Sequence, residues 1–369
     1  MRTGRKRRTI FRHRGGPPHS KTLGLLPQLA AALNPKERML METGFTKLLA
    51  IDFPIMQAPI GGAAGPELAA GVSNAGALGS VTVWLAPPAQ TASLVSATLR
   101  LTNKPFSVNV RADLSQFSHV TTAIESGAKL IHLFWGDPTP YASAIHRGGA
   151  KLLCTVANAD ETKQALDAGA DILIAQGWEA GGHVRGTLTT FALVPTVVDL
   201  AGSVPVLAAG GVVDGRGLAS MLALGASGVM MGTRFVASEE SRAHPDYKKA
   251  ITTARQTDAV YLKNLFEVGW PGAPHRVLRN STVRAWEAAG SPPSGSRPNE
   301  KEVVATRPDG SPVQRYSAPH PMAGMTGNIE ALAHYAGQGV ERVIDILPAA
   351  KIIEATMHQA REQLSQFKA

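Results

Sequence analysis

Eight short apolar runs recur between residues 55 and 231, and each is followed by a loop and a helix-length segment. The runs span residues 55–58, 77–81, 106–110, 130–134, 152–156, 172–175, 206–209 and 229–231. Strands that alternate with helices form a parallel sheet. Eight such units in about 190 residues predict an α/β fold, a (β/α)8 TIM barrel. An open doubly wound sheet is the rival, and it is disfavoured because no G-x-G-x-x-G motif follows the first run.

Glycines follow the last two predicted strands. Barrel enzymes place their chemistry at the carboxyl ends of the strands, and the loops after strands seven and eight often bind phosphate through backbone N–H groups. The seventh run ends in Ala209-Gly210-Gly211, and the eighth leads into Gly232-Thr233. The two corners together predict a phosphate site at Gly210, Gly211, Gly232 and Thr233.

The sixth run leads into a glycine-rich stretch, Gln176-Gly-Trp-Glu-Ala-Gly-Gly-His183. Gly181 and Gly182 allow the backbone to pass close to something flat or bulky. His183 lies just beyond the strand, and its imidazole can exchange a proton near neutral pH. The stretch therefore predicts a binding and proton-transfer site. A glycine turn followed by a surface histidine is the purely structural alternative.

The excess of positive charge is confined to the N-terminus. The chain has 37 lysines and arginines against 28 acidic residues, a net charge of +9, and nine of those cations precede Glu37, the first acid. The remaining 28 cations balance the 28 acids, so the basic character belongs to a tail and not to a groove. We expect residues 1–40 to be a basic, disordered extension and the body to bind no nucleic acid. Contact of the tail with RNA, DNA or anionic lipid is the alternative.

The rest of the composition indicates a globular cytoplasmic protein. Hydrophobic residues make up 44% of the chain, enough to fill a core. The single cysteine, Cys154, excludes an internal disulfide and a cysteine-rich metal site, and it suits a reducing compartment. No spacing of histidine, cysteine and carboxylate residues indicates a metal. Residues 68–99 carry no charge, but glycine, proline and polar residues interrupt them, so we expect neither a membrane span nor a membrane partner.

The predicted domain organisation has four parts. Residues 1–40 are the extension and 41–285 the barrel, with a charged, helix-compatible stretch at 239–266. Residues 286–320 are rich in serine, proline and glycine and predict a loop or linker. Residues 321–369 show helical spacing with a break at Gly337-Gln338-Gly339, and they predict a helical segment that packs on the barrel.

A set of these motifs resembles the nitronate monooxygenase family, once called 2-nitropropane dioxygenases. The motifs are Pro54-Ile-Met-Gln57, Asn109, Glu179-Ala-Gly-Gly-His183, Ala209-Gly-Gly211 with Asp214-Gly215, and Met231-Gly-Thr-Arg-Phe235. They lie in order over about residues 46–280, and the likeness is weaker beyond. Flavin-dependent enoyl-acyl-carrier-protein reductases and some NADH:quinone reductases share nearly all of them.

The resemblance implies a non-covalent FMN. It assigns Pro59, Ile60 and Gly61 to the flavin ring, and Asn109, Thr155 and Gly181 to the ring or ribityl chain. The phosphate would be held by Gly210, Gly211, Gly232 and Thr233. Gln176, Gly182 and Ala209 complete the implied cofactor-binding residues. Some members have a lysine near the end of strand five, where this chain has Leu153-Cys154.

The resemblance also implies a reaction. His183 would be the general base that takes the proton α to the nitro group of a neutral nitroalkane, O2 would reoxidise the flavin, and the products would be a carbonyl compound and nitrite. An NAD(P)H-dependent reductase of enoyl thioesters or quinones is the alternative, and a barrel that has lost catalysis is a third reading. A homodimer is left open.

Other candidate residues are assigned structural roles. We expect His119, His132 and His146 to be structural or exposed and Cys154 to be a buried strand residue. His320 lies in the Ala318-Pro-His-Pro321 turn, which we expect to be a plain loop; closure over the flavin together with Tyr316 is the alternative.

Overall fold

The computed structural model describes residues 42–366. The predicted basic extension, residues 1–40, lies outside the described residues.

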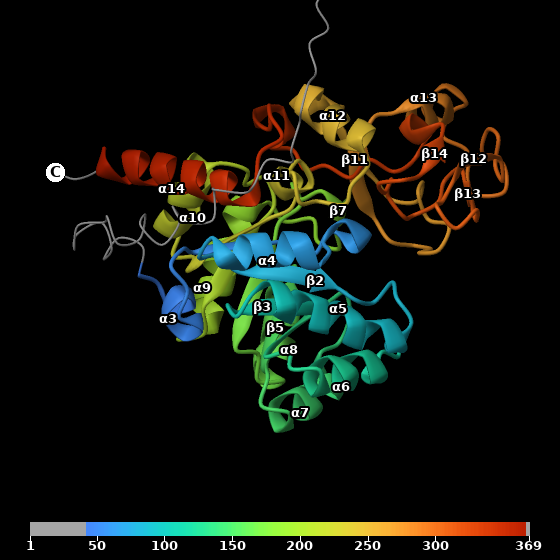
Figure 1. The fold of residues 1–369 in the computed structure, drawn as a ribbon. Helices are drawn as coiled ribbons and strands as arrows, with labels where there is room; N and C mark the ends of the chain where they lie inside the picture. The colour runs from blue at the N-terminus through green and yellow to red at the C-terminus, as the bar shows by residue number, and fades with distance from the viewer. Residues whose placement is uncertain (1–41, 367–369) are drawn as a thin grey trace, which may run out of the picture.

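Eight parallel strands form the barrel, which confirms the predicted fold class (Figure 1). The strands are β1 (Ile55–Gln57), β2 (Gly79–Thr82), β3 (Phe106–Arg111), β4 (Leu130–Phe134), β5 (Lys151–Val156), β6 (Ile172–Gln176), β8 (Val206–Ala209) and β9 (Gly228–Met231). Their spatial order is β1-β9-β8-β6-β5-β4-β3-β2. The ring closes between β1 and β2, where Leu78 N donates to Ile55 O and Gln57 N donates to Leu78 O, both at 2.9 Å. Each of the eight predicted runs overlaps one strand.

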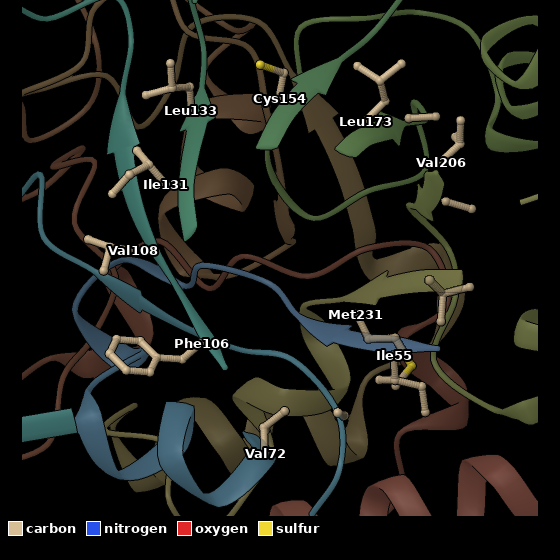
Figure 2. Close-up of a cluster of buried hydrophobic side chains, with 14 of the residues drawn as sticks. Ile55, Val72, Phe106, Val108, Ile131, Leu133, Cys154, Leu173, Val206 and Met231 are labelled. Carbon is tan, nitrogen blue, oxygen red and sulfur yellow. The ribbon is translucent and has the colours of Figure 1, made fainter. Parts of the chain in front are cut away.

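Helices surround the ring and cover its outer face. They are α4 (Pro66–Asn74), α5 (Pro88–Leu101), α6 (Phe117–Glu125), α7 (Thr139–Arg147), α8 (Ala159–Asp167), α9 (Thr190–Ala201), α10 (Gly215–Ala223) and the short α11 (Thr233–Val236). Outward side chains of the strands, such as Val108, Ile131 and Leu173, join one large apolar cluster with helix residues such as Val72 (Figure 2). Because side chains alternate along a strand, their neighbours point into the barrel.

The inward residues fill the amino-terminal half of the barrel. Met56, Leu153 and Leu207 form a second apolar cluster with Phe45 and Leu49 of α3 (Gly44–Leu49). Helix α3 closes this end, where Thr43 Oγ1 donates to Ser227 O at 2.7 Å. The amino-terminal end of the barrel is thus filled and covered.

Residues after the barrel fold differently from the prediction. Residues 239–266 contain helix α12 (Pro245–Thr253), the turn η2 (Gln256–Asp258) and strand β10 (Ala259–Leu262), which pairs with β11 (His275–Leu278). Helix α13 (Ser281–Ala288) follows. The expected linker at 286–320 instead contains β12 (Val303–Thr306) and β13 (Pro312–Gln314), which form a three-stranded sheet with β14 (Thr326–Gly327).

Two arginines explain why the predicted linker is ordered. Arg297 is buried and donates from Nη1 to Leu265 O at 2.9 Å, while Arg315 pairs with Glu302 at 2.6 Å. The composition indicated a loop, but these ion pairs and the buried Val304 and Val313 hold the segment as a small sheet.

The C-terminal segment is helical only in its last part. Residues 321–348 form β14 and two single turns, η3 (Ile329–Ala331) and η4 (Val340–Arg342), so the prediction of a helix before the Gly337 break is wrong. Their apolar side chains do not line one helical face: Ile329, Ala331 and Leu332 pack against Val304 and Val313 of the small sheet. Helix α14 (Ala349–Ser365) packs on α10, and Figure 1 shows the two side by side.

Within residues 42–366, the longest helices are too short or too polar to cross a bilayer.

The contact between α10 and α14 depends on Gly215. A Cβ at this position would lie 2.3 Å from Thr356 O and 2.4 Å from Ala360 N, both backbone atoms of α14. We expect Gly215→Ala to destabilise the fold by about 1–3 kcal/mol, because the helices must separate. The midpoint of urea unfolding measures the change. The control is Gly44→Ala, whose Cβ meets only ordinary contacts at 3.5 Å and should change stability little. Equal midpoints for the two variants would contradict the packing described.

Candidate active site

A cavity of about 410 Å³ opens at the carboxyl ends of the barrel strands. All residues predicted for the site line it: Pro59, Ile60, Gly61, Asn109, Thr155, Gln176, Gly181, Gly182, His183, Ala209, Gly210, Gly211, Gly232 and Thr233. The closed ring brings these positions together although they span 175 residues of sequence, from 59 to 233.

Inward polar side chains form the floor of the cavity. Asn109 Nδ2 donates to His132 O at 3.1 Å, and His132 Nε2 shares a hydrogen bond with Thr155 Oγ1 at 2.7 Å. Gln176 Nε2 donates to His183 O at 3.2 Å, which ties β6 to the glycine-rich stretch. Burial lowers the pKa of His132 to about 3, so this imidazole is neutral. His132 is structural as predicted, but it also contributes to the cavity wall, which the sequence did not indicate.

Glycines shape the end of the cavity next to α11. Gly210 and Gly211 have φ values of +110° and +72°, which disfavour any side chain. Gly339 lies against this corner, since a Cβ there would be 2.6 Å from Gly211 O. Gly337 N donates to Thr233 Oγ1 at 3.0 Å. The C-terminal segment thus completes a cradle made of backbone.

The carboxylate of Glu179 holds the glycine-rich stretch in place. Its Oε2 accepts from the backbone N and the Oγ1 of Thr190, at 2.8 and 3.0 Å. Thr190 Oγ1 also lies 3.0 Å from Gly210 O, a second acceptor that can share its single proton. Glu179 therefore joins the sixth and seventh loops of the barrel and has a structural role.

His183 lies in the short strand β7 (Gly182–His183), which pairs with β11 so that His183 faces His275. Its ring lines the cavity, and within the described residues its buried Nε2 has no hydrogen-bond partner. Burial holds the pKa of His183 well below 6.5, with smaller effects from the nearby His275, Arg111 and His320. The imidazole is therefore neutral at pH 7 and able to accept a proton.

An aromatic wall lies against His183. The Trp270 ring stacks on His183 with centroids 3.8 Å apart, and the Arg111 guanidinium carbon lies 3.4 Å from the centroid of the Trp270 ring. Trp84 and Trp135 contact Trp270 edge-on at 5.4 and 5.3 Å. Arg111 is paired with Asp113. The sequence motifs did not predict this wall, although three of the chain's five tryptophans belong to it.

Two tyrosines and a histidine complete the lining beside His183. Tyr247 donates to Tyr335 O at 2.6 Å, and Tyr335 donates to Ala318 O at 2.7 Å. His320 lines the cavity and is buried, so the expectation of a plain loop is wrong. Tyr316, which the alternative paired with it, is not among the residues that line the cavity.

The remaining candidates lie away from the cavity. His119 Nε2 bonds to Ala86 O at 2.9 Å, and His146 pairs with Asp171 at 3.3 Å near the surface, as expected. Cys154 is buried in β5, and burial raises the pKa of its thiol.

The cavity lining carries little formal charge. Arg307 supplies the only lysine or arginine side chain that the described residues contribute to it, and no aspartate or glutamate lines it. Residues 42–366 contain no cluster of three or more ligating side chains that would hold a metal ion. The chemistry of the site therefore depends on neutral imidazoles, hydroxyls and backbone groups.

Comparison with known proteins identifies the family. The nitronate monooxygenase family matches residues 42–132 and 116–359. A nitronate monooxygenase of Pseudomonas aeruginosa is 32% identical over 87% of this chain and 100% of its own length. A (3aS,4S,5R,7aS)-5-hydroxy-7a-methyl-1-oxo-octahydro-1H-indene-4-carboxyl-CoA dehydrogenase of Rhodococcus jostii is 36% identical over 68% of this chain and 69% of that protein.

Solved structures show the same fold. FabK from Thermotoga maritima superposes with a TM-score of 0.72 at 31% identity, over 88% of this chain and 98% of that one. The nitroalkane oxidase from Streptomyces ansochromogenes gives 0.71 at 26% identity, over 88% and 100%. The resemblance found in the sequence motifs is thereby confirmed: the chain belongs to the nitronate monooxygenase family of oxidoreductase enzymes.

Proposed function

We propose that the protein is an FMN-dependent nitronate monooxygenase, which uses O2 to convert alkyl nitronates and nitroalkanes to a carbonyl compound and nitrite. The observation that carries the proposal is His183: a neutral imidazole with an unpartnered Nε2, at the carboxyl-end cavity of the barrel. The nitronate monooxygenase of Pseudomonas aeruginosa, which matches over its full length, supports this reaction class.

The residues of the cavity fit FMN. Gly232 leaves room for a phosphate, because a Cβ there would meet only Ala58, at 3.6 Å, and the positive φ values of Gly210 and Gly211 keep the other corner free of side chains. The apolar and backbone surfaces of Pro59 and Ile60 suit a flat ring. The roles implied by the resemblance are proposed for this chain: Gly61, Asn109, Thr155, Gln176, Gly181, Gly182, Ala209 and Thr233 complete the binding site. Bound FMN would supply the two-electron redox chemistry, and the protein supplies position and electrostatics.

His183 supplies the proton chemistry for a neutral nitroalkane. The proton α to the nitro group passes to the imidazole, the C–H electron pair forms a C=N bond, and the negative charge moves to the nitro oxygens. Because His183 is desolvated and neutral, its nitrogen is free to accept this proton at pH 7. A substrate that arrives as a nitronate has already lost the proton and does not need this step.

A reductase of thioesters or quinones that uses NAD(P)H is the second candidate. FabK and the carboxyl-CoA dehydrogenase are as similar to this chain as the nitronate monooxygenases are. Arg307 favours this candidate specifically, because a cation in the lining suits a phosphate-bearing substrate.

One paired assay separates the two candidates. Oxygen uptake is measured with alkyl nitronates, and NADH or NADPH oxidation is measured in parallel with quinones and enoyl thioesters. We expect nitronate-dependent oxygen uptake with nitrite formed in proportion. Rapid NAD(P)H oxidation without any response to nitronate would support the reductase instead.

The base role of His183 predicts a selective loss. We expect His183→Ala to lower kcat/KM for a neutral nitroalkane by about 10²- to 10⁴-fold, since general-base catalysis is lost. Turnover of the pre-formed nitronate should fall far less. His146→Ala, which replaces a histidine outside the cavity, is the control and should match the wild type. Unchanged turnover of the neutral nitroalkane by His183→Ala would show that the assignment is wrong.

The desolvation of His183 predicts the pH profile. A base whose pKa is lowered stays unprotonated in more acidic solution, so activity with a neutral nitroalkane should persist below pH 6.5, the ordinary histidine value. The decline should begin only at lower pH. The profile of kcat/KM measures this, and a decline centred at 6.5 or higher would contradict the described environment.

The phosphate cradle predicts a cofactor-binding defect. Gly232→Val places a side chain where the structure leaves space, so the fold should survive while bound flavin is lost. Flavin content of the purified variant is read from its visible absorbance. As a control, the flavin-free variant and flavin-free wild type should unfold at the same urea concentration. Full flavin occupancy in Gly232→Val would place the phosphate elsewhere.

A further inference from the structure

His320 is the second histidine of the cavity with an unused nitrogen. Its side chain is 7% exposed, its ring lines the cavity, and its buried Nε2 has no hydrogen-bond partner among the described residues. A buried polar group without a partner is costly, and where its ring also lines a cavity, a bound molecule can complete the hydrogen bond.

The fold holds this imidazole in a fixed place. Ala318 O accepts from the Tyr335 hydroxyl at 2.7 Å, and Pro321 O accepts from His244 N at 3.1 Å, so the loop is tied on both sides of His320. The rings of Tyr247 and Tyr335 contact the imidazole with centroid distances of 5.9 and 6.5 Å.

His320 also lies against the loop after β1. Gly61 has a φ of +45°, and a Cβ there would lie 2.8 Å from Cε1 of His320. The glycine therefore makes room for the imidazole beside Pro59 and Ile60. The Tyr335 ring lies 5.3 Å from the His183 ring and 6.5 Å from the His320 ring, so the two histidines border the same part of the cavity.

We propose that His320 is a second catalytic residue, which donates a hydrogen bond from Nε2 to the oxygen that gains negative charge when His183 removes the substrate proton. The inference rests on the proposed function. During that step the α-proton moves to His183 and the C–H pair forms the C=N bond. The N=O π pair moves onto a nitro oxygen, and no further reactant is needed.

Charge and burial suit this role. Burial lowers the pKa of His320 to about 4, so the ring is neutral at pH 7 and carries one N–H. A neutral donor in a dry site stabilises a developing oxyanion strongly, because no reorganisation is required. One imidazole therefore accepts the proton, and the other donates a hydrogen bond to the oxygen that carries the displaced charge.

The test compares two buried histidines. His320→Leu removes the donor, and His320→Gln restores an N–H at a similar distance from the backbone. His334→Leu is the matched control: His334 is also buried, has an unpartnered Nε2 and stacks on Tyr247 at 5.0 Å, but it does not line the cavity.

Kinetics of the flavin-loaded enzyme give the first readout. We expect His320→Leu to lower kcat for a neutral nitroalkane by about 10²-fold, the usual loss of one oxyanion donor. With the pre-formed nitronate as substrate, we expect His320→Leu to raise KM relative to the wild type. His320→Gln should recover most of the loss, and His334→Leu should match the wild type. Equal losses in His320→Leu and His334→Leu, or no loss in either, would overturn the proposal.

Binding gives a readout that does not depend on turnover. Propionate, a carboxylate with the two-oxygen geometry of a nitronate, is titrated against each flavin-loaded variant and followed by the flavin absorbance. The Kd should rise about tenfold in His320→Leu only; an unchanged Kd would overturn the inference. If the wild type oxidises no nitronate, the proposed function fails, and the propionate titration still decides whether His320 binds an anionic oxygen.

Discussion

The closed ring of parallel strands is the constraint on which the rest of the structure depends. Side chains alternate along each strand, so every second residue points into the barrel and its neighbours point towards the helices. In β3, β4 and β5 the outward residues Val108, Ile131 and Cys154 are apolar, while the inward residues Asn109, His132 and Thr155 are polar. Since α3 and apolar residues fill the amino-terminal half of the barrel, the polar inward side chains lie at its carboxyl-terminal end. The cavity is a direct result of this alternation.

Desolvation then determines the chemistry of that mouth. The pKa values of His183, His132 and His320 are all lowered because these rings are buried among aromatic and aliphatic groups. Each imidazole is neutral and keeps one donor and one acceptor. The cation of Arg111, across Trp270 from His183, acts in the same direction. The three imidazoles can therefore donate or accept protons while they remain uncharged in the resting site.

The sequence predicted the barrel well because its signal is local. Apolar runs such as 130–134 and 206–209 recur with regular spacing. Glycines such as Gly210 and Gly232 follow these runs directly, so both signals can be read from short stretches of sequence. The aromatic wall could not be predicted, because Trp270, Arg111 and His183 meet only after β11 has paired with β7. His320 was given a plain loop as its first assignment for the same reason: its partners Tyr247 and Tyr335 come from distant segments. The small sheet at 303–327 was mistaken for a linker and a helix, because buried arginine pairs outweigh a composition rich in serine and proline.

A crystal structure of the purified protein with its flavin tests the central claim most directly. The account predicts that the phosphate lies between the Gly210-Gly211 corner and the Gly232-Thr233 corner, with the ring beside Gly61 and His183. Arg307 is the alternative binding partner for the phosphate, since it is the one lysine or arginine that lines the cavity in residues 42–366. It lies between β12 and β13, and Figure 1 shows these strands far from α10, which follows the Gly210-Gly211 corner. Density for the phosphate at Arg307, or for the flavin outside the mouth of the barrel, would contradict the account.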